Sequence, residues 1–71
     1  MNPISPKKLL SSKWTAVNPQ NKEKHFVITD VEFDEDSNVI RCVNQAIMSK
    51  REVEIDWQTL KDSNVWKLGW V

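Results

Sequence analysis

The sequence contains few of the residues that small domains use as covalent or metal staples. It has one cysteine, Cys42, and one histidine, His25, in 71 residues. An internal disulfide is therefore excluded, and a zinc site with four Cys and His ligands cannot be assembled. Because small domains without disulfides are typical of reducing compartments, we expect a cytoplasmic protein.

Long apolar runs are also missing. No stretch approaches the roughly 20 residues that a membrane-spanning helix needs, and residues 1–10 lack the continuous apolar core of a signal peptide. We therefore expect no membrane partner. Ten lysines and arginines balance ten acids, so the net charge favours no class of partner. The charges are unevenly spread, since residues 1–25 carry five lysines and one glutamate, whereas residues 26–36 carry five acids and no base.

Tryptophan is the abundant residue, with four copies in this short chain. A domain of this size buries only about 60% of the surface that its unfolded chain would expose, so its core depends on large side chains. One buried Trp contributes roughly 4–6 kcal/mol of gross hydrophobic stabilisation. We therefore expect several of the four rings in the core.

Alternating apolar residues predict the C-terminal strands. Every second residue is apolar in two stretches, 53–57 and 66–70, which is the pattern of half-buried strands. Residues 58–62 between them have helical composition but are too few for an α-helix, which predicts a 3₁₀ turn. The acids that alternate with the apolar residues, Glu52, Glu54 and Asp56, are expected cross-strand partners for Arg41 or Lys67.

Three further strands are expected earlier in the chain, at residues 13–17, 25–33 and 39–48. A polar loop at residues 18–24 follows the first, and an acidic hairpin loop at residues 34–38 follows the second. In the second strand the apolar residues change phase after Ile28, which predicts a bulge near Thr29 and Asp30. For the third strand either face could point inward.

We therefore predict a mainly β fold, a small SH3-like five-stranded barrel with a short N-terminal helical turn and a 3₁₀ turn before the last strand. Residues 1–12 form the arm that carries the helical turn, and residues 13–71 form a single small β-barrel domain. An OB-like or open five-stranded sheet fits the same pattern. The expected core comprises Leu10, Trp14, Phe26, Ile28, Val31, Phe33, Ile40, Cys42, Val53, Ile55, Trp57, Leu60, Leu68 and at least one of Trp66 and Trp70.

Six short motifs lie along the chain: Ser5–Leu10, Ser12–Val17, Lys22–Phe26, Ile55–Trp57, Leu60–Asp62 and Gly69–Trp70. Together they resemble the small tryptophan-rich bacterial protein family, a domain of unknown function. The likeness covers nearly the whole chain. It implies one intact domain in the bacterial cytoplasm and transfers no activity.

Groups suited to catalysis or metal binding are sparse. His25 has no nucleophile motif associated with it, and the apolar neighbours of Cys42 would raise its pKa and leave it inert. The consecutive acids of residues 34–36 lack the alternating spacing of a calcium loop. We therefore expect a non-enzymatic protein without cofactor or metal, acting as a small binding or adaptor module.

The expected binding surface combines lysine with tryptophan: Lys7, Lys8, Lys13, Trp14, Trp66 and Trp70. A protein or peptide is the first expected partner, held in an SH3-like groove walled by Trp57, Trp66 or Trp70. The alternative is single-stranded nucleic acid (RNA), with bases stacked on exposed rings beside the lysines. A homo-oligomer that buries exposed Trp is the third. The solvent exposure of each ring distinguishes among these hypotheses.

Overall fold

Five antiparallel strands form one sheet in the computed structural model of the chain, which describes residues 2–71. The strands are β1 (Lys13–Gln20), β2 (Glu23–Phe33), β3 (Val39–Ala46), β4 (Glu52–Glu54) and β5 (Trp66–Leu68), in the order β4-β3-β2-β1-β5. Two 3₁₀ turns, η1 (Pro6–Lys8) and η2 (Trp57–Lys61), complete the described elements. The mainly β fold, the N-terminal turn and the 3₁₀ turn before the last strand are confirmed.

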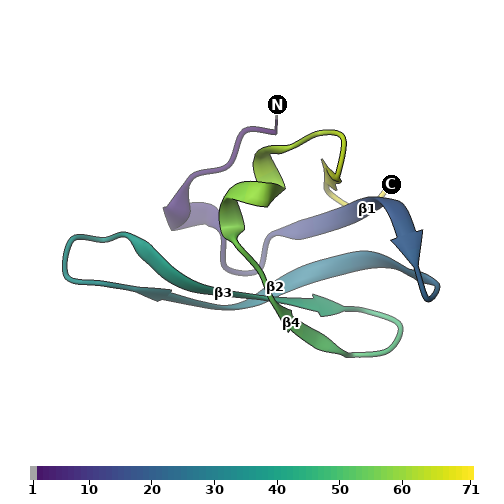
Figure 1. Cartoon of the computed structure of the whole chain (residues 1–71), viewed down its shortest axis with the longest axis horizontal. Helices are drawn as coiled ribbons and strands as arrows, with labels where there is room; N and C mark the ends of the chain where they lie inside the picture. The colour runs from purple at the N-terminus through teal and green to yellow at the C-terminus, as the bar shows by residue number, and fades with distance from the viewer. Residues whose placement is uncertain (1) are drawn as a thin grey trace.

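The N-terminal arm and η2 lie together over one side of the sheet, which we call the covered face (Figure 1). The arm is tied to this layer by Asn2, whose side-chain amide donates to the carbonyl oxygens of Leu60 and Trp66 at 2.9 and 2.6 Å. The core lies between the two layers and consists of Leu9, Trp14, Phe26, Ile28, Cys42, Ala46 and Leu60. The opposite side of the sheet is the open face.

The sheet is not closed into a barrel, so the expectation of a barrel is wrong. Within residues 2–71, β4 pairs only with β3 and β5 only with β1, which leaves them at opposite edges. Each has three residues because the chain turns away soon after it. Asp56 caps η2 immediately after β4, and Gly69, with φ +83°, reverses the chain after β5. Neither strand is long enough to reach across and close the sheet.

The first hairpin differs from its prediction. β1 continues to Gln20, and the reversal is made by Asn21 and Lys22, both with positive φ, as in the tight turns that join antiparallel strands. Pro19 is tolerated within the strand because β5 pairs only with Trp14–Ala16. Pro19 has no N–H group, and on that edge no strand needs a hydrogen bond from it.

The β2–β3 ladder settles which residues point inward. Its register shifts between Ile28 and Asp30, which confirms the predicted bulge and keeps both halves of β2 directed at one core. In β3, Cys42, Asn44 and Ala46 are buried on the covered face. The strand ends at Ala46 rather than at Met48, because the Lys50 N–H donates to the Ala46 carbonyl and closes a turn.

Four expected core residues are instead exposed: Leu10, Phe33, Ile40 and Leu68. Leu9, not Leu10, enters the core at the end of η1. Phe33 and Ile40 lie near the end of the β2–β3 hairpin, whose tip extends beyond the covering layer (Figure 1). Phe33 remains partly exposed although it lines a hollow with Ser5, Pro6 and Lys7 of the arm. Leu68 lies on the short edge strand β5, which within residues 2–71 has a neighbouring strand, β1, on one side only.

The other residues expected in the core are buried or half-buried. Val31, Ile55 and Trp57 pack half-buried against the core, whereas Val53 is half-buried in β4. Trp66 packs edge-on against Phe26, with ring centroids 5.1 Å apart, which satisfies the expectation for one of the last two rings.

No helix within residues 2–71 has the length and apolarity that crossing a membrane requires.

Candidate functional site

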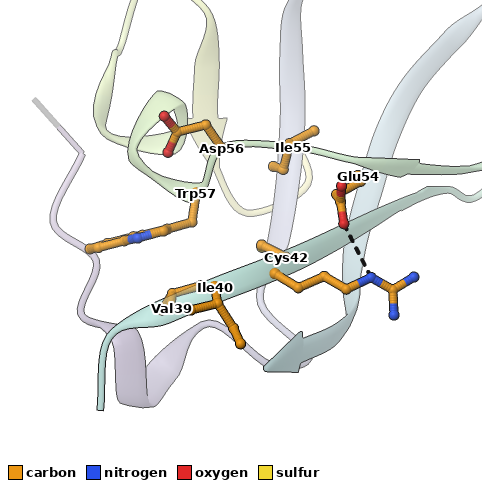
Figure 2. Close-up of a pocket in the computed structure, with 8 residues that line it drawn as sticks. Val39, Ile40, Cys42, Glu54, Ile55, Asp56 and Trp57 are labelled. Carbon is orange, nitrogen blue, oxygen red and sulfur yellow. Dashed lines mark hydrogen bonds and ion pairs between the residues drawn. The ribbon is translucent and has the colours of Figure 1, made fainter. Parts of the chain in front are cut away.

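A groove of about 370 Å³ lies where β3, β4 and η2 meet. Residues 39–42 of β3 form one wall, and residues 54–57, from the end of β4 to the start of η2, form the other. Figure 2 shows the Trp57 ring extending from the start of η2 over the start of β3, where Val39 and Ile40 lie. We call this hollow the β3 groove.

Among the described residues 2–71, no strand lies next to the outer edge of β3 along this groove. β4 pairs with Val43–Gln45, and the Ile55 N–H donates to the Cys42 carbonyl at 2.9 Å. The chain then turns away into η2. Residues 39–41 therefore have β2 on one side and no strand from residues 2–71 on the other. An edge of this kind is a template on which a further strand can pair.

Trp57 is held in place by the cap of η2. The Asp56 carboxylate accepts the Gln58 N–H at 3.0 Å, and the Asp56 carbonyl accepts the Thr59 hydroxyl at 2.8 Å. The half-buried Trp57 ring packs against the core, and the Lys61 ammonium lies 4.6 Å from its centroid. The groove therefore has one positioned aromatic wall with part of its surface exposed.

The open face beside the groove carries an excess of negative charge. The Arg41 guanidinium lies 3.2 Å from Asp30, 3.5 Å from Glu32 and 3.2 Å from Glu54. The predicted pairing of Arg41 with Glu54 is thereby confirmed. One positive and three negative charges leave this Arg41 cluster with a net charge of −2, and Asp56 adds another acid to the groove lining.

Residues 12–71 match the family described as Tryptophan-rich protein (DUF2389). The chain belongs to this family. The resemblance carried by the sequence motifs is confirmed, although the family description assigns no activity. No curated protein and no solved structure matches the chain. The family description therefore leaves the geometry of the chain as the guide to its function.

The residues of the predicted lysine and tryptophan surface mostly lie apart in the structure. Trp14 is 0% exposed and its Nε1–H donates to the Ser12 hydroxyl at 2.8 Å, so its assignment to a surface is corrected. Trp66 packs half-buried on the covered face. Lys7 and Lys8 are exposed in η1, on the arm.

Two of the six predicted residues do meet, on the open face. The Lys13 ammonium lies 4.8 Å from the centroid of the Trp70 ring, which is 44% exposed. His25 lies beside the same ring, with centroids 6.0 Å apart. Lys67 pairs with Thr15 and therefore projects from the same face as Lys13. These four side chains, of Lys13, His25, Lys67 and Trp70, form what we call the Trp70 surface.

Gly69 brings Trp70 to this position. Its φ of +83° is readily adopted only by glycine, and its N–H donates to the Lys13 carbonyl at 2.7 Å. The Thr15 hydroxyl then donates to the Gly69 carbonyl at 2.7 Å, and the Trp70 Nε1–H donates to the Phe26 carbonyl at 2.9 Å. The turn therefore carries Trp70 from the edge strand onto the open face.

The two side chains considered for catalysis are those of His25, which lies within hydrogen-bonding distance of a backbone carbonyl, and Cys42, which is buried. The His25 Nε2 lies 3.1 Å from the Val71 carbonyl oxygen. Cys42 is buried, and desolvation raises the pKa of its thiol to about 11, which is the direction predicted from its apolar neighbours. Within residues 2–71, no three His, Cys, Asp or Glu side chains are placed to hold a metal ion.

An ion pair between the buried Glu23 carboxylate and the half-exposed Arg51 side chain joins the turns at one end of the sheet. Glu23, at the start of β2, is buried and accepts two hydrogen bonds from Arg51 and one from the Ser49 hydroxyl, both in the β3–β4 connection. The Arg51 and Ser49 hydrogen bonds lower the pKa of Glu23 to about 2. This carboxylate is satisfied by its partners and holds two hairpins together.

None of the residues that line the β3 groove is among the six predicted for the binding surface, although Trp57 is one of the three candidate walls of the expected SH3-like groove. The parity of Trp57 with Val53 and Ile55 indicated a core residue, and the apolar side chain of Ile40 indicated another. One signal was present, since Glu54 and Asp56 flank this segment with charge. Whether Glu54 and Asp56 border a groove depends on where β4 ends, and the alternating pattern does not predict that boundary.

Proposed function

We propose that this protein is a small non-enzymatic module that binds an extended protein segment along the free edge of β3. The observation that supports it is an unpaired strand edge at residues 39–41 beside a groove of about 370 Å³ walled by Trp57. A segment added there gains main-chain hydrogen bonds from β3 and places alternate side chains in the groove. Affinity would come from the backbone and specificity from the walls.

Trp57 and Ile40 are the proposed contact residues. Ile40 is 62% exposed although it lies within a strand, and it becomes buried if a further strand pairs with this edge. A partly exposed aromatic ring held by packing loses little conformational entropy on binding, which makes Trp57 a suitable anchor. The Trp wall expected from the comparison with SH3-like modules is therefore assigned to Trp57 rather than to Trp66 or Trp70.

Two side chains that could act as nucleophiles, those of Cys42 and Ser49, are buried or hydrogen-bonded, which agrees with a binding role. The Cys42 thiol is buried with a raised pKa, and Ser49 donates its hydroxyl to the Glu23 carboxylate. The compartment that we propose is the cytoplasm, where an unpaired thiol such as Cys42 stays reduced.

Backbone chemical-shift mapping with a set of extended heptapeptides tests the proposal. We expect shifts to converge on residues 39–41, and on the indole N–H of Trp57. Ile40→Lys should abolish them, because a charge on an edge strand opposes pairing. Leu10→Lys is the matched control, since Leu10 is 59% exposed but does not line the groove. Scattered shifts, or equal loss in both variants, would contradict the proposal, and sedimentation at rising concentration identifies a second copy as the occupant.

A second candidate function is single-stranded nucleic-acid binding at the Trp70 surface. The observation that favours it is the Lys13 ammonium beside an exposed Trp70 ring, with Lys67 on the same face. Stacking of a base on an aromatic side chain contributes about 1–3 kcal/mol, and nearby lysines would bind the phosphates.

Fluorescence titration with an oligouridylate at low and moderate salt tests this candidate. Quenching should require Trp70, and Lys13→Gln and Lys67→Gln should each lower the salt slope by about one. Lys50→Gln, in the β3–β4 connection, is the control. Quenching that is absent, or that salt does not change, excludes this function.

A further inference from the structure

We infer that the segment bound at the edge of β3 is cationic, with lysine or arginine at alternate positions and apolar residues between them. This inference rests on the proposed function and assigns the chemical class of its ligand. It follows from what the two faces of the sheet present to a strand added beside residues 39–41.

The alternation follows from strand geometry. Successive side chains of an added strand point to opposite faces of the sheet. Towards the covered face they meet the ring of Trp57, which packs against the core. Towards the open face they meet the Arg41 cluster, since Glu54 is paired with Val43 and bonded to Arg41. One set of ligand side chains therefore contacts an aromatic wall, and the other contacts charge.

Because the net charge of the Arg41 cluster is negative, a basic ligand is favoured. Arg41 shares its single positive charge among Asp30, Glu32 and Glu54, so the carboxylates are only partly neutralised. They are accessible, because their side chains are between half and two-thirds exposed, with Glu54 the most exposed at 66%. Like charges placed side by side oppose association, so acidic segments and polyanions are disfavoured at this edge.

Three matched peptides test whether the bound segment is cationic. The probes are acetylated, amidated heptapeptides in which valine alternates with lysine, with threonine or with glutamate. Dissociation constants are measured by chemical-shift titration at low and moderate salt. We expect the lysine peptide to bind about tenfold more tightly than the threonine peptide at low salt, with the advantage shrinking as salt screens the charges. Binding of the glutamate peptide should be the weakest of the three.

Two substitutions within the Arg41 cluster should act in opposite directions. Glu54→Gln removes a negative charge and should weaken binding of the lysine peptide by about twofold to fivefold, whereas Arg41→Gln removes a positive charge and should strengthen it by a similar factor. Glu35→Gln, at the tip of the β2–β3 hairpin, is the control and should change nothing. Weakening by both cluster substitutions overturns the inference, because the cluster would then act only by holding the strands in place.

The outcomes separate the inference from the proposed function. If the lysine and threonine peptides bind residues 39–41 with equal affinity, the strand-addition site stands and the inference of a cationic ligand is overturned. If none of the three peptides shifts residues 39–41, both are overturned.

Discussion

The two faces of the sheet use tryptophan and charge in opposite ways. On the covered face, Trp14 is sealed beneath the arm and η2, together with Leu9 and Leu60. On the open face, Trp70 lies at the surface beside Lys13, and Lys67 projects from the same face. The Arg41 cluster lies on β2, β3 and β4, towards the other edge of the sheet. The covered face is apolar except for Asn44, whereas the open face is divided into a basic end and an acidic end.

This difference assigns stability and recognition to separate residues. Apolar burial on the covered face supplies the driving force for folding. Exposed ion pairs of the open face contribute little to the free energy of unfolding because water screens them. They nevertheless create local fields that determine which partners approach. Substitutions on the two faces should therefore be separable in experiments.

The largest effect is expected from removal of the sealed ring. Trp14→Ala should lower the free energy of unfolding by about 3–5 kcal/mol, because the cavity cannot collapse around so large a deletion. In a domain this small, that loss approaches the total stability. Trp70→Ala is the matched control and should cost about 1 kcal/mol or less, since its ring is already partly in water. Equal losses in urea melts would mean that the two faces do not differ in this way.

Acid should break the Glu23 ion pair. The pKa of Glu23 is lowered from its usual 4.5 to about 2 by the Arg51 and Ser49 hydrogen bonds, so its stabilising contribution is complete above pH 4.5 and is lost as the pH falls towards 2. The melting temperature should decrease through this window. The difference between the wild type and Glu23→Gln should narrow over the same range, whereas Glu35→Gln should follow the wild type. An unchanged difference down to pH 2 would contradict this assignment.

Gly69→Ala tests the turn that carries Trp70 to the open face. No atom lies within 4 Å of an added Cβ, so the cost comes from the backbone, whose φ is +83°. We expect a loss of about 1 kcal/mol in thermal or urea unfolding. The Lys13 and Trp70 contact should weaken as well, seen as a change in Trp70 indole shift. A neutral effect on both readouts would show that the turn is not strained by a side chain.

Asn44→Leu should increase stability. The Asn44 side chain is 1% exposed on the covered face, and its Oδ1 has no hydrogen-bond partner within residues 2–71. Leucine has the same branched shape without the unsatisfied oxygen, so a gain of about 1 kcal/mol is expected in a urea melt. Asn44→Asp is the opposing control and should be strongly destabilising, because it buries a charge. A loss of stability with leucine would indicate that Asn44 has a polar partner.

The smallest change in stability is expected on the open face. Glu54→Gln removes one exposed partner of Arg41 and should change the free energy of unfolding by about 0.5 kcal/mol or less. The same variant is expected to weaken binding of a basic peptide. A destabilisation as large as that of a core substitution would mean that the acidic end of the open face is structural.

Several features of the fold were predictable because they depend on local rules. The phase change between Ile28 and Val31 located the bulge, and the short helical segment after Trp57 located η2. The apolar neighbours of Cys42 indicated a buried thiol. Each of these predictions needs only strand periodicity or side-chain chemistry over a few residues.

The candidate site was less predictable. Strand alternation places Trp66 and Trp70 on one face, whereas in the structure Trp66 packs on the core and the turn at Gly69 carries Trp70 to the opposite face. Alternation does not state how deeply a ring is covered. It also does not reveal that β4 stops at Glu54, which exposes the edge of β3. Strand ends are determined by competing hydrogen bonds, such as the Asp56 cap of η2, whose strength depends on the packing around them.

By itself, the sequence determined a mainly β domain with five strands, two short turns and membership of a tryptophan-rich family. Only the tertiary structure decided that the sheet stays open, that Trp14 is sealed while Trp70 reaches the surface, and that within residues 2–71 no strand pairs with the outer edge of residues 39–41. The physical reason is that a period of two assigns side chains to faces. Which face is covered, and where each edge ends, depends on contacts between residues far apart in the chain, such as those of Asn2 with Leu60 and Trp66.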